Sequence, residues 1–338
     1  MDLNVPLTSL PVAPAPIPSV DVIIVNWNAG VQLNDCLLAL SRCDRSGFTL
    51  NRVVVVDNAS TDGSLDAVHA LRRDLPLRAI KNVQNRGFAV ACNQGARESS
   101  ADYLLFLNPD TRVETDALVS AIAFMEATEN ADTAVCGAQL VDETGTISRT
   151  CARRPTPRHF AAKMLGLDKI APRRFETHVM DSWDHRTTQA VDHVMGAFYL
   201  VRTADFEQMG GFDERFFVYL EDLDLSVRLR NTGRRIVYLT AAQVFHKGGG
   251  SSENVKAARL FYALHSRILY GFKHFSPLWA TLLLLGTLLV EPWIRVAVAL
   301  LHGSGQDAWN TIRGTARLWM ALPSIGPAVR RSERLKTT

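Results

Sequence analysis

The chain has 338 residues, with 37 Lys and Arg against 34 Asp and Glu and a formal net charge of +3. It is too long for one minimal domain and can bury a sizeable core. A charge balance this close to neutral argues against a dedicated nucleic-acid binder, which usually carries a strong basic excess. The five cysteines show no zinc-site spacing, so we expect free thiols in a reducing cytoplasm.

Residues 1–19 contain five prolines and no basic residue. A signal peptide begins with basic residues and continues into an apolar stretch, which this segment does not do. We therefore expect a mobile N-terminal arm over residues 1–19, ahead of a domain at residues 20–252.

In the first half of that domain, short apolar segments alternate with segments of helical spacing. We expect strands at Val22–Val25, Val53–Val56, Tyr103–Leu107 and Ala134–Leu140, and helices at Val31–Leu40, Ser64–Leu71, Gly87–Ala96 and Asp116–Met125. This alternation predicts an α/β fold with a mixed, mostly parallel sheet and helices on both faces. Ligands bind such sheets beyond the carboxyl ends of the strands.

Residues 149–188 mix basic residues, prolines and histidines without a period, which predicts a long variable connection. Regular patterns then return. We expect a strand at Val191–Val201, a helix at Leu223–Leu229, short strands at Ile236–Leu239 and Gln243–Phe245, and a flexible loop from His246 to Ser252.

Polar side chains follow the predicted strands at the ends where a ligand would bind. A carboxylate such as Asp57 can accept the ring N3–H of uracil or thymine, and its charge strengthens that bond. Arg86, followed by Gly87 at the start of a helix, suits a diphosphate. Such residues can also serve only as turn or cap residues, and Arg86 with Gly87 is a weak signal by itself.

Asp110 follows the strand at Tyr103–Leu107 and can bind a divalent cation through its carboxylate. His246 can supply a second ligand, and a mixed oxygen and imidazole donor set suits Mn²⁺ as well as Mg²⁺. The alternative is that His246 is an ordinary histidine at the end of a strand and binds no metal.

Four carboxylates, Asp213, Glu221, Asp222 and Asp224, lie within twelve residues among aromatic and aliphatic side chains. Asp222 can act as the general base for a hydroxyl, because the start of a helix favours its ionised form. Glu221 and Asp224 remain alternatives, since spacing does not choose among the three.

The C-terminal region, residues 253–338, is helical, hydrophobic and basic in character. An amphipathic helix is expected at Val255–Phe275, and thirteen uncharged residues at Leu278–Val290 are followed by the break Glu291-Pro292 and by Trp293–Leu301. A membrane span needs about 20 apolar residues. The pattern therefore favours a helix pair lying at a membrane surface, and the alternative is a hairpin packed on the catalytic domain or in a homodimer.

Several motifs in this order resemble family 2 glycosyltransferases of the GT-A fold, within the rhamnosyltransferase-like branch. The resemblance covers about residues 20–250. It rests on Val25-Asn26-Trp27-Asn28, Val56-Asp57-Asn58-Ala59-Ser60-Thr61-Asp62-Gly63-Ser64, Asn85-Arg86-Gly87-Phe88 through Gly95, Leu107-Asn108-Pro109-Asp110, Gly210-Gly211-Phe212-Asp213-Glu214, Glu221-Asp222-Leu223-Asp224-Leu225 and His246. The chain departs from the commonest metal motif, Asp-x-Asp, because Asn108 takes its first position.

The resemblance implies an inverting transfer from a nucleoside-diphosphate sugar to an acceptor hydroxyl. In this resemblance Asp57 holds the pyrimidine, with Asn26 and Asn28 near the nucleobase, and Arg86 and Asn93 lie near the donor. Asp110 and His246 bind the metal. Asp222 is the general base for the acceptor, with Glu221 beside it. The implied donor is dTDP-L-rhamnose or a UDP-sugar, and the acceptor is a lipid-linked or cell-surface glycan. We expect peripheral or monotopic attachment to the cytoplasmic face of the membrane.

Three other classes compete with this interpretation. A non-catalytic scaffold of the same fold would be favoured by loss of Asp222 or Asp110, and both are present. A nucleotidyltransferase would normally carry a lysine-rich phosphate loop near the first strand, where this chain has none. An NAD(P)-dependent oxidoreductase lacks its Gly-x-Gly-x-x-Gly motif after Val25.

Overall fold

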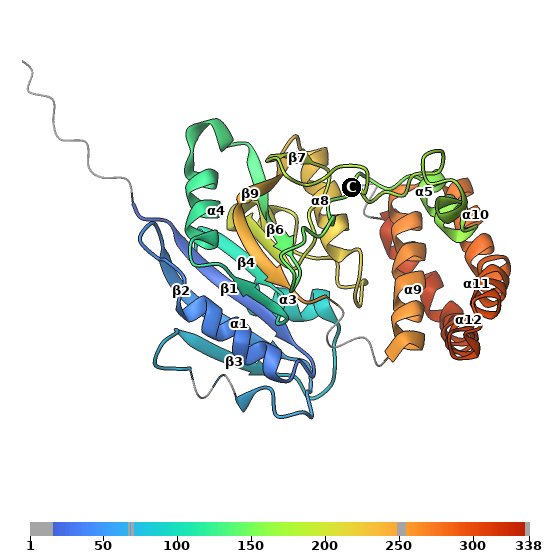
Figure 1. The fold of residues 1–338 in the computed structure, drawn as a ribbon, viewed down its shortest axis with the longest axis horizontal. Coiled ribbons are helices and arrows are strands. Elements are labelled where there is room, and N and C mark those ends of the chain that lie inside the picture. The colour runs from blue at the N-terminus through green and yellow to red at the C-terminus, as the bar shows by residue number, and fades with distance from the viewer. Residues whose placement is uncertain (1–15, 67, 69–70, 249–254, 335–338) are drawn as a thin grey trace, which may run out of the picture.

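The structure is a computed structural model that describes residues 16–66, 68, 71–248 and 255–334. An α/β unit stands beside a bundle of C-terminal helices (Figure 1). Residues 1–15 of the predicted N-terminal arm, part of the predicted helix at Ser64–Leu71 and most of the loop after His246 lie outside the described residues.

One mixed sheet organises the α/β unit, in the order β3-β2-β1-β4-β8-β6-β9-β5, with β7 paired to β9. The strands are β1 (Ser19–Asn26), β2 (Thr49–Asp57), β3 (Leu77–Lys81), β4 (Tyr103–Leu107), β5 (Thr111–Val113), β6 (Thr133–Val141), β7 (Gln189–Val191), β8 (Phe198–Arg202) and β9 (Arg235–His246). The first four are mutually parallel, and β6 is parallel to β9. The predicted mixed, mostly parallel sheet is confirmed.

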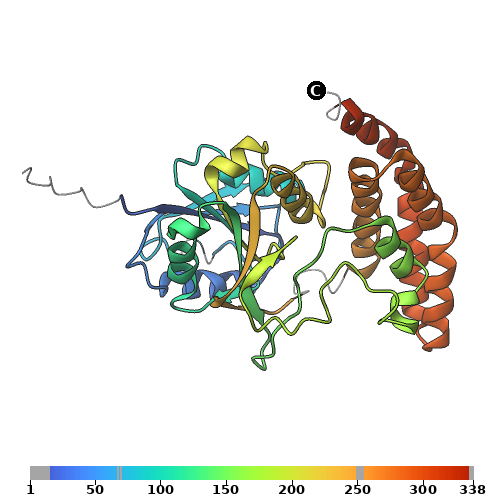
Figure 2. The same cartoon turned by 90° about the horizontal axis from the view of Figure 1, so that it is seen from above.

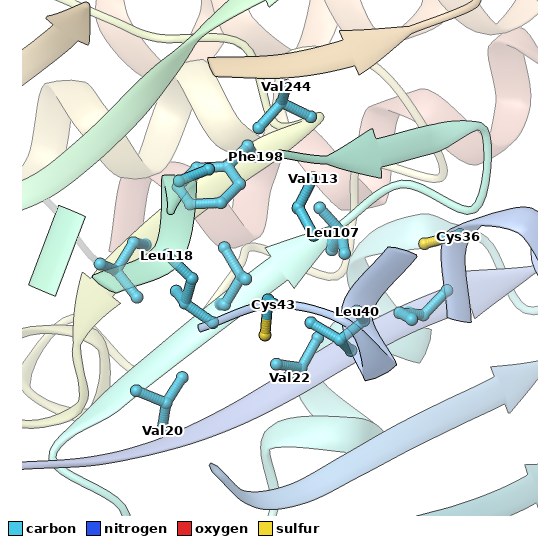
Figure 3. Close-up of a cluster of buried hydrophobic side chains, with 14 of the residues drawn as sticks. Val20, Val22, Cys36, Leu40, Cys43, Leu107, Val113, Leu118, Phe198 and Val244 are labelled. Carbon is cyan, nitrogen blue, oxygen red and sulfur yellow. The ribbon is translucent and has the colours of Figure 1, made fainter. Parts of the chain in front are cut away.

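Alternate side chains of each central strand enter two separate cores, one on each face of the sheet. On one face, Val22 and Ile24 of β1 pack with α1 (Val31–Ser41) and α4 (Ala117–Glu126) in the cluster of Figure 3. On the other, Ile23 packs under α3 (Phe88–Ala96), α7 (Thr203–Gln208) and α8 (Glu221–Asn231). Burying each large aliphatic side chain contributes roughly 1.5–3 kcal/mol. All five cysteines are free and buried, as expected.

The predicted strand at Val191–Val201 is wrong, because the chain leaves the sheet over residues 192–197 between β7 and β8. Val194 in that loop packs directly on β6, where a Cβ on Gly137 would lie 2.5 Å from the Val194 Cβ. The two short strands predicted at Ile236–Leu239 and Gln243–Phe245 are instead one continuous strand, β9, which keeps its pairing with β6 through a register shift.

Residues 149–188, expected to be an irregular connection, carry two helices, α5 (Pro157–Met164) and α6 (Leu167–Ile170). A capping box between Thr156 and His159 and a proline in the first turn start α5. The connection crosses from the sheet to the helical bundle (Figure 2). There α5 packs on α10, and a Cβ on Gly286 would lie 2.6 Å from Cε of Met164.

The C-terminal bundle comprises α9 (Lys256–His274), α10 (Pro277–Leu289), α11 (Glu291–Leu301) and α12 (Gly305–Arg334). Glu291, at the break between α10 and α11, is fully buried and paired with two arginines. Its Oε1 accepts from Arg267 Nη1 at 3.3 Å and from Arg295 Nε at 2.8 Å. A buried carboxylate needs such partners, so the Glu291-Pro292 break is fixed by an internal ion cluster.

A second ion cluster joins α9 to the α/β unit. The fully buried Asp224 of α8 accepts hydrogen bonds from Arg228 Nε, Lys273 Nζ and His274 Nε2, each at 2.8 Å. Lys273 also reaches Asp213 at 2.6 Å. Burial opposes ionisation of Asp224, but the hydrogen bond from His274 and the charges of Arg228 and Lys273 lower its pKa. Asp224 is therefore an anchor for the C-terminal helices.

We predict that Asp224→Asn lowers the free energy of unfolding by about 3 kcal/mol at neutral pH, because it leaves buried cations without their counter-charge. A carboxylate with a lowered folded-state pKa stabilises the fold above its unfolded pKa of about 3.9. This stabilisation is lost as the pH falls through the folded-state pKa. The difference in unfolding free energy between wild type and variant should therefore become smaller in acid. Urea unfolding measures both effects.

Asp132→Asn is the matched control, since the Asp132–Arg235 pair lies at the surface, with side chains 56% and 39% exposed. An exposed pair contributes about 0–1 kcal/mol. Equal losses in the two variants would contradict the anchoring role of Asp224.

Candidate active site

The carboxyl ends of β1 and β2 place Asn26 and Asp57 side by side in the parallel register. Asn26 Nδ2 donates to Asp57 Oδ1 at 2.8 Å, and the backbone N–H of Ser60 donates to Asp57 Oδ2 at 3.2 Å. Asn26 is fully buried and also bonds Ser60 and Ser64. Asp57 is thus a fixed acceptor at the sheet edge, and Asn26 holds it there.

Asn28 connects the loop after β1 to the loop after β2. Its Oδ1 accepts from the Thr61 N–H at 2.8 Å, and its own N–H donates to Ser60 Oγ at 2.9 Å. Its backbone is left-handed, with φ at 51°, a conformation that asparagine tolerates better than most residues. The two loops therefore form one rigid rim around Asp57.

A network of side-chain amides supports the loop that carries Arg86. Asn82 and Gln94 exchange hydrogen bonds at 2.9 and 3.1 Å, and Asn82 Nδ2 also donates to Asn58 Oδ1 at 2.9 Å. Asn58 Nδ2 in turn donates to the Gly87 carbonyl at 3.1 Å. The Arg86 side chain stays exposed above this network and is available to a bound anion.

Gly87 makes close contact with the loop before α8. Its φ is 88°, and a Cβ there would lie 2.5 Å from the carbonyl oxygen of Phe217. The same carbonyl accepts from the Phe88 N–H at 2.6 Å. Only glycine satisfies both the positive φ and this approach, so the Arg86 loop and the loop leading to Glu221 and Asp222 are locked together.

Asn93, which the resemblance assigned to the donor, has its amide engaged by backbone. Its Nδ2 donates to the Phe212 carbonyl at 2.9 Å, and its Oδ1 accepts from the Phe212 N–H at 3.0 Å. This pairing mimics a peptide group and ties α3 to the turn at residues 210–214.

The candidate metal ligands Asp110 and His246 are neighbours, with His246 Nε2 3.4 Å from Asp110 Oδ1. Strand pairing between β5 and β9 brings them together, since Thr111 pairs with His246 and the Lys247 N–H donates to the Asp110 carbonyl. Among the described residues no group of three or more His, Cys, Asp or Glu side chains could hold a metal. One carboxylate and one imidazole fit a cation that takes its remaining ligands from phosphate oxygens and water.

Two strained residues precede the acidic motif. Tyr219 and Leu220 both have left-handed backbones, with φ of 70° and 66°, directly before α8 begins at Glu221. Strain of this kind costs of order 1–3 kcal/mol per residue and persists only where surrounding contacts enforce it. Here the contacts are a 2.7 Å hydrogen bond from Ser266 of α9 to the Val218 carbonyl and the stacking of Phe217 on Tyr262, with ring centroids 4.3 Å apart.

Asp222 keeps partial access to solvent, with its side chain 17% exposed. Its Oδ2 accepts from the Gly196 N–H at 2.8 Å, and its Oδ1 accepts from the Leu223 N–H at 2.8 Å. A Cβ on Gly196 would lie 2.9 Å from Oδ2, so a side chain there would displace the Asp222 carboxylate. These contacts fix the carboxylate in one orientation.

Environment separates Asp222 from the other two candidates for the base. Glu221 is buried, and its Oε2 has no hydrogen-bond partner among the described residues; burial and then the charge of Asp222 raise its pKa well above the usual value. This environment favours the protonated carboxyl. Asp224 is committed to Arg228, Lys273 and His274. Asp222 is the acid of this motif that is suited to accept a proton.

Sequence reasoning missed the residues that support Asp222. His193 and Gly196 fell inside a predicted strand, and a glycine within a strand pattern is a recognised sign of a bulge or a close approach. Asn58 and Asn82 followed strands and could have been read as site residues. The stacking of Phe217 on Tyr262 had no local signal, because it joins segments on either side of β9.

Family models match most of the chain. A model of glycosyl transferase family 2 matches residues 21–182, and one of glycosyl transferase family group 2 matches residues 103–326. The chain belongs to glycosyltransferase family 2. It is similar to rhamnosyltransferases within this family, as the predicted resemblance implied.

Two curated relatives illustrate this similarity. Rhamnosyltransferase WbbL of Escherichia coli is 33% identical over 165 residues, which are 48% of this chain and 59% of WbbL. The N-acetylglucosaminyl-diphospho-decaprenol L-rhamnosyltransferase of Mycobacterium tuberculosis is 28% identical over 266 residues, 74% of this chain and 82% of the relative.

Solved structures confirm the GT-A fold. The mannosyltransferase PcManGT from Pyrobaculum calidifontis, in complex with GDP-Man and Mn²⁺, aligns with a TM-score of 0.52 at 18% identity, over 98% of this glycosyltransferase and 92% of PcManGT. GalNAc-T7 with UDP, GalNAc and Mn²⁺ aligns with a TM-score of 0.51 at 14% identity, over 76% and 51% of the two chains.

We predict that Gly87→Ala destabilises the enzyme by more than its positive φ alone explains, because the new methyl group collides with the Phe217 carbonyl. Gly145→Ala is the matched control: Gly145 has φ of 76°, and a Cβ there meets nothing within 4 Å. The control should cost about 1 kcal/mol, and Gly87→Ala should cost at least 1–2 kcal/mol more by chemical unfolding. Equal losses would show that the contact at Gly87 carries no constraint.

Proposed function

We propose that this enzyme transfers an L-rhamnosyl group from dTDP-L-rhamnose, with inversion, to a hydroxyl of a lipid-linked or cell-surface glycan. The observation that carries the proposal is the 2.6 Å hydrogen bond from the Phe88 N–H to the Phe217 carbonyl, which joins the loop of Arg86 to the loop leading to Asp222. This contact supports a single site in which Arg86 would bind the donor and Asp222 would accept the proton. The similarity to two rhamnosyltransferases supports this sugar.

In the proposed reaction, Asp57 accepts the N3–H of the donor pyrimidine and fixes the nucleotide at the sheet edge. Arg86 lies over the diphosphate and offsets its charge. Asp222 removes the proton of the acceptor hydroxyl as its oxygen bonds to the anomeric carbon. The bond from that carbon to the phosphate oxygen breaks, and the electron pair leaves with the nucleoside diphosphate.

Asp110 and His246 are the residues that would hold a divalent ion. Mg²⁺ or Mn²⁺ bound there would neutralise the charge that develops on the departing diphosphate. The 3.4 Å separation of the two side chains and their mixed donor atoms support this assignment. PcManGT and GalNAc-T7, which share this fold, were both solved with Mn²⁺, in agreement with this assignment.

A second donor class is a UDP-sugar, since uracil and thymine present the same N3–H to Asp57. A donor screen decides between them: dTDP-L-rhamnose, dTDP-glucose, UDP-N-acetylglucosamine and GDP-mannose, each with a polyprenyl-diphosphate-linked N-acetylglucosamine acceptor, with and without chelator. We expect nucleotide release from dTDP-L-rhamnose with acceptor present. Turnover only with a UDP-sugar would overturn the proposed donor, and a non-catalytic scaffold would give no turnover at all.

We predict that Asp222→Asn lowers kcat by roughly 10²–10⁴-fold, the usual contribution of a general base, with donor binding retained. Glu221→Gln is the matched control, because an amide replaces a buried neighbouring carboxyl whose raised pKa favours the protonated form. It should change kcat far less. A larger loss of kcat in Glu221→Gln than in Asp222→Asn would indicate that Glu221 is the base. Calorimetric titration with dTDP checks that both variants still bind the nucleotide.

We propose further that the C-terminal helices lie on the cytoplasmic face of a membrane. Large apolar side chains are exposed along α10, α11 and α12, among them Trp279, Trp293, Trp309, Ile312, Trp319 and Met320. Interfacial helices favour tryptophan at the boundary and arginine on the flank, and Arg313 and Arg317 are exposed beside the apolar stripe of α12.

The lengths of these helices agree with attachment at a surface. Within the described residues, no single helix is long and apolar enough to cross a membrane. The pair α10 and α11 passes the same criteria together, but it is bent by 41° at Glu291. Peripheral or monotopic binding is therefore our proposal. The alternative is that the same apolar surface closes a homodimer.

We predict that the full-length protein floats with vesicles containing about 30% phosphatidylglycerol and binds pure phosphatidylcholine vesicles more weakly. Exchanging both Arg313 and Arg317 for Gln should weaken binding to the anionic vesicles by roughly tenfold or more, since each basic residue contributes about 1 kcal/mol. Exchanging Trp293 and Trp309 for Ser should weaken binding to both vesicle types.

Val83→Ser is the control, because Val83 is fully exposed on the α/β unit, far from α10–α12 in the sequence. It should leave flotation unchanged. A wild-type protein that stays in the soluble fraction and dissociates from dimer to monomer on the tryptophan exchanges would favour the homodimer.

A further inference from the structure

The loop between β7 and β8 brings a buried histidine behind the proposed base. His193 Nε2 lies 3.7 Å from Asp222 Oδ2, and His193 Nδ1 lies 3.1 Å from Ser226 Oγ. Ser226 is also 3.0 Å from the Tyr199 hydroxyl and donates to the Asp222 carbonyl at 2.9 Å. Tyr199, Ser226 and His193 therefore form a hydrogen-bonded chain, and the free ring nitrogen of its last member, His193, faces the carboxylate of Asp222.

The number of protons at Ser226 limits the tautomer of His193. A hydroxyl carries one proton, and the carbonyl of Asp222 can only accept. When Ser226 donates to that carbonyl, its two other neighbours must be donors. Tyr199 keeps its proton, because burial raises its pKa above the usual value. His193 must then carry its proton on Nδ1, which leaves the lone pair of Nε2 facing Asp222.

We propose that His193 is a positioning residue that shares with Asp222 the proton taken from the acceptor. In the resting enzyme no proton lies between His193 Nε2 and Asp222 Oδ2. Two acceptors that face each other in this way bind a proton more strongly than the carboxylate does alone.

This inference rests on the proposed role of Asp222 as base. During transfer, the acceptor O–H bond breaks, the oxygen bonds to the anomeric carbon, and the proton passes to Asp222 and is then shared with His193 Nε2. The electron pair of the broken glycosyl–phosphate bond leaves with the nucleoside diphosphate. The proton is later lost to water, and the pair returns to its resting state.

Several ionisable groups surround the pair and set its proton affinity. Facing it from the neighbouring elements are Glu221, Asp224 and Arg228 of α8, Cys92 of α3, Tyr199 of β8 and His178 of the long connection. Burial lowers the pKa of His193, and the charge of Asp222 opposes this effect. The imidazole is thus neutral at rest, and protonation of the pair at low pH would block the base.

The first test is the tautomer of His193 in the wild-type, full-length protein. Nitrogen-15 NMR of the histidine side chains at pH 7.5 distinguishes a protonated Nδ1 from a protonated Nε2. The His193 signal is assigned by its loss in His193→Gln or, if that variant fails to fold, by its shift in Ser226→Ala. We expect the proton on Nδ1. A proton on Nε2 would make His193 an ordinary donor to Asp222 and would overturn the proposal.

The second test is the pH dependence of kcat, with dTDP-L-rhamnose and the lipid-linked acceptor. His193→Gln should lower kcat by on the order of 10²-fold and leave KM for the donor unchanged. In this variant the acidic limb of the pH profile of kcat should move to lower pH, because Asp222 alone binds a proton less strongly than the pair. His185→Gln, which replaces another fully buried imidazole, is the control and should leave the limb in place.

The outcomes separate the inference from the proposed function. An acidic limb that does not move in His193→Gln would overturn proton sharing even if kcat falls. A wild-type enzyme that is inactive with dTDP-L-rhamnose would refute the proposed donor, and the NMR measurement would still decide the tautomer. Full activity in Asp222→Asn would refute the base and the proton sharing together.

Discussion

The carbonyl of Phe217 is the point on which the proposed active site depends. It accepts a hydrogen bond from Phe88 and lies against Gly87, and the ring of the same residue stacks on Tyr262 of α9. One residue thus joins the Arg86 loop, the loop before Asp222 and the C-terminal bundle. The left-handed backbones of Tyr219 and Leu220 are stable only because these contacts hold the loop on both sides.

Three neighbouring carboxyl groups differ in chemistry because their surroundings differ. The carboxylate of Asp224 has a lowered pKa beside Arg228 and Lys273 and holds α9 in place, while burial raises the pKa of Glu221 well above its usual value. Asp222, between them, is partly exposed and receives two backbone N–H groups. The charge of Asp222 adds to burial in raising the pKa of Glu221, so the two neighbouring acids do not behave alike.

The sequence predicts those parts of the site that depend on local order. Asp57 and Asp110 follow apolar strands, and parallel pairing then places strand ends on one edge, so their positions could be read directly. Residues that act through long-range contacts could not be found in this way. Val194 and Gly196 look like part of a strand, yet the loop leaves the sheet to pack on β6 and to reach Asp222. The continuous strand β9 and the helix α5 likewise depend on partners far away in the sequence.

The amino-acid composition changes near residue 253, but this change does not divide the chain into two independent structural units. One face of α9 supports the loop before Asp222 through Tyr262 and Ser266, and its end binds Asp224 through Lys273 and His274. Its other face is buried in a core that includes Leu288 of α10 and Leu318 of α12. A force that reorients α10–α12, such as adsorption to a surface, therefore acts on the helix that fixes the strained loop before Asp222. Because packed helices move as rigid elements, the C-terminal bundle forms part of the mechanical support of the proposed base.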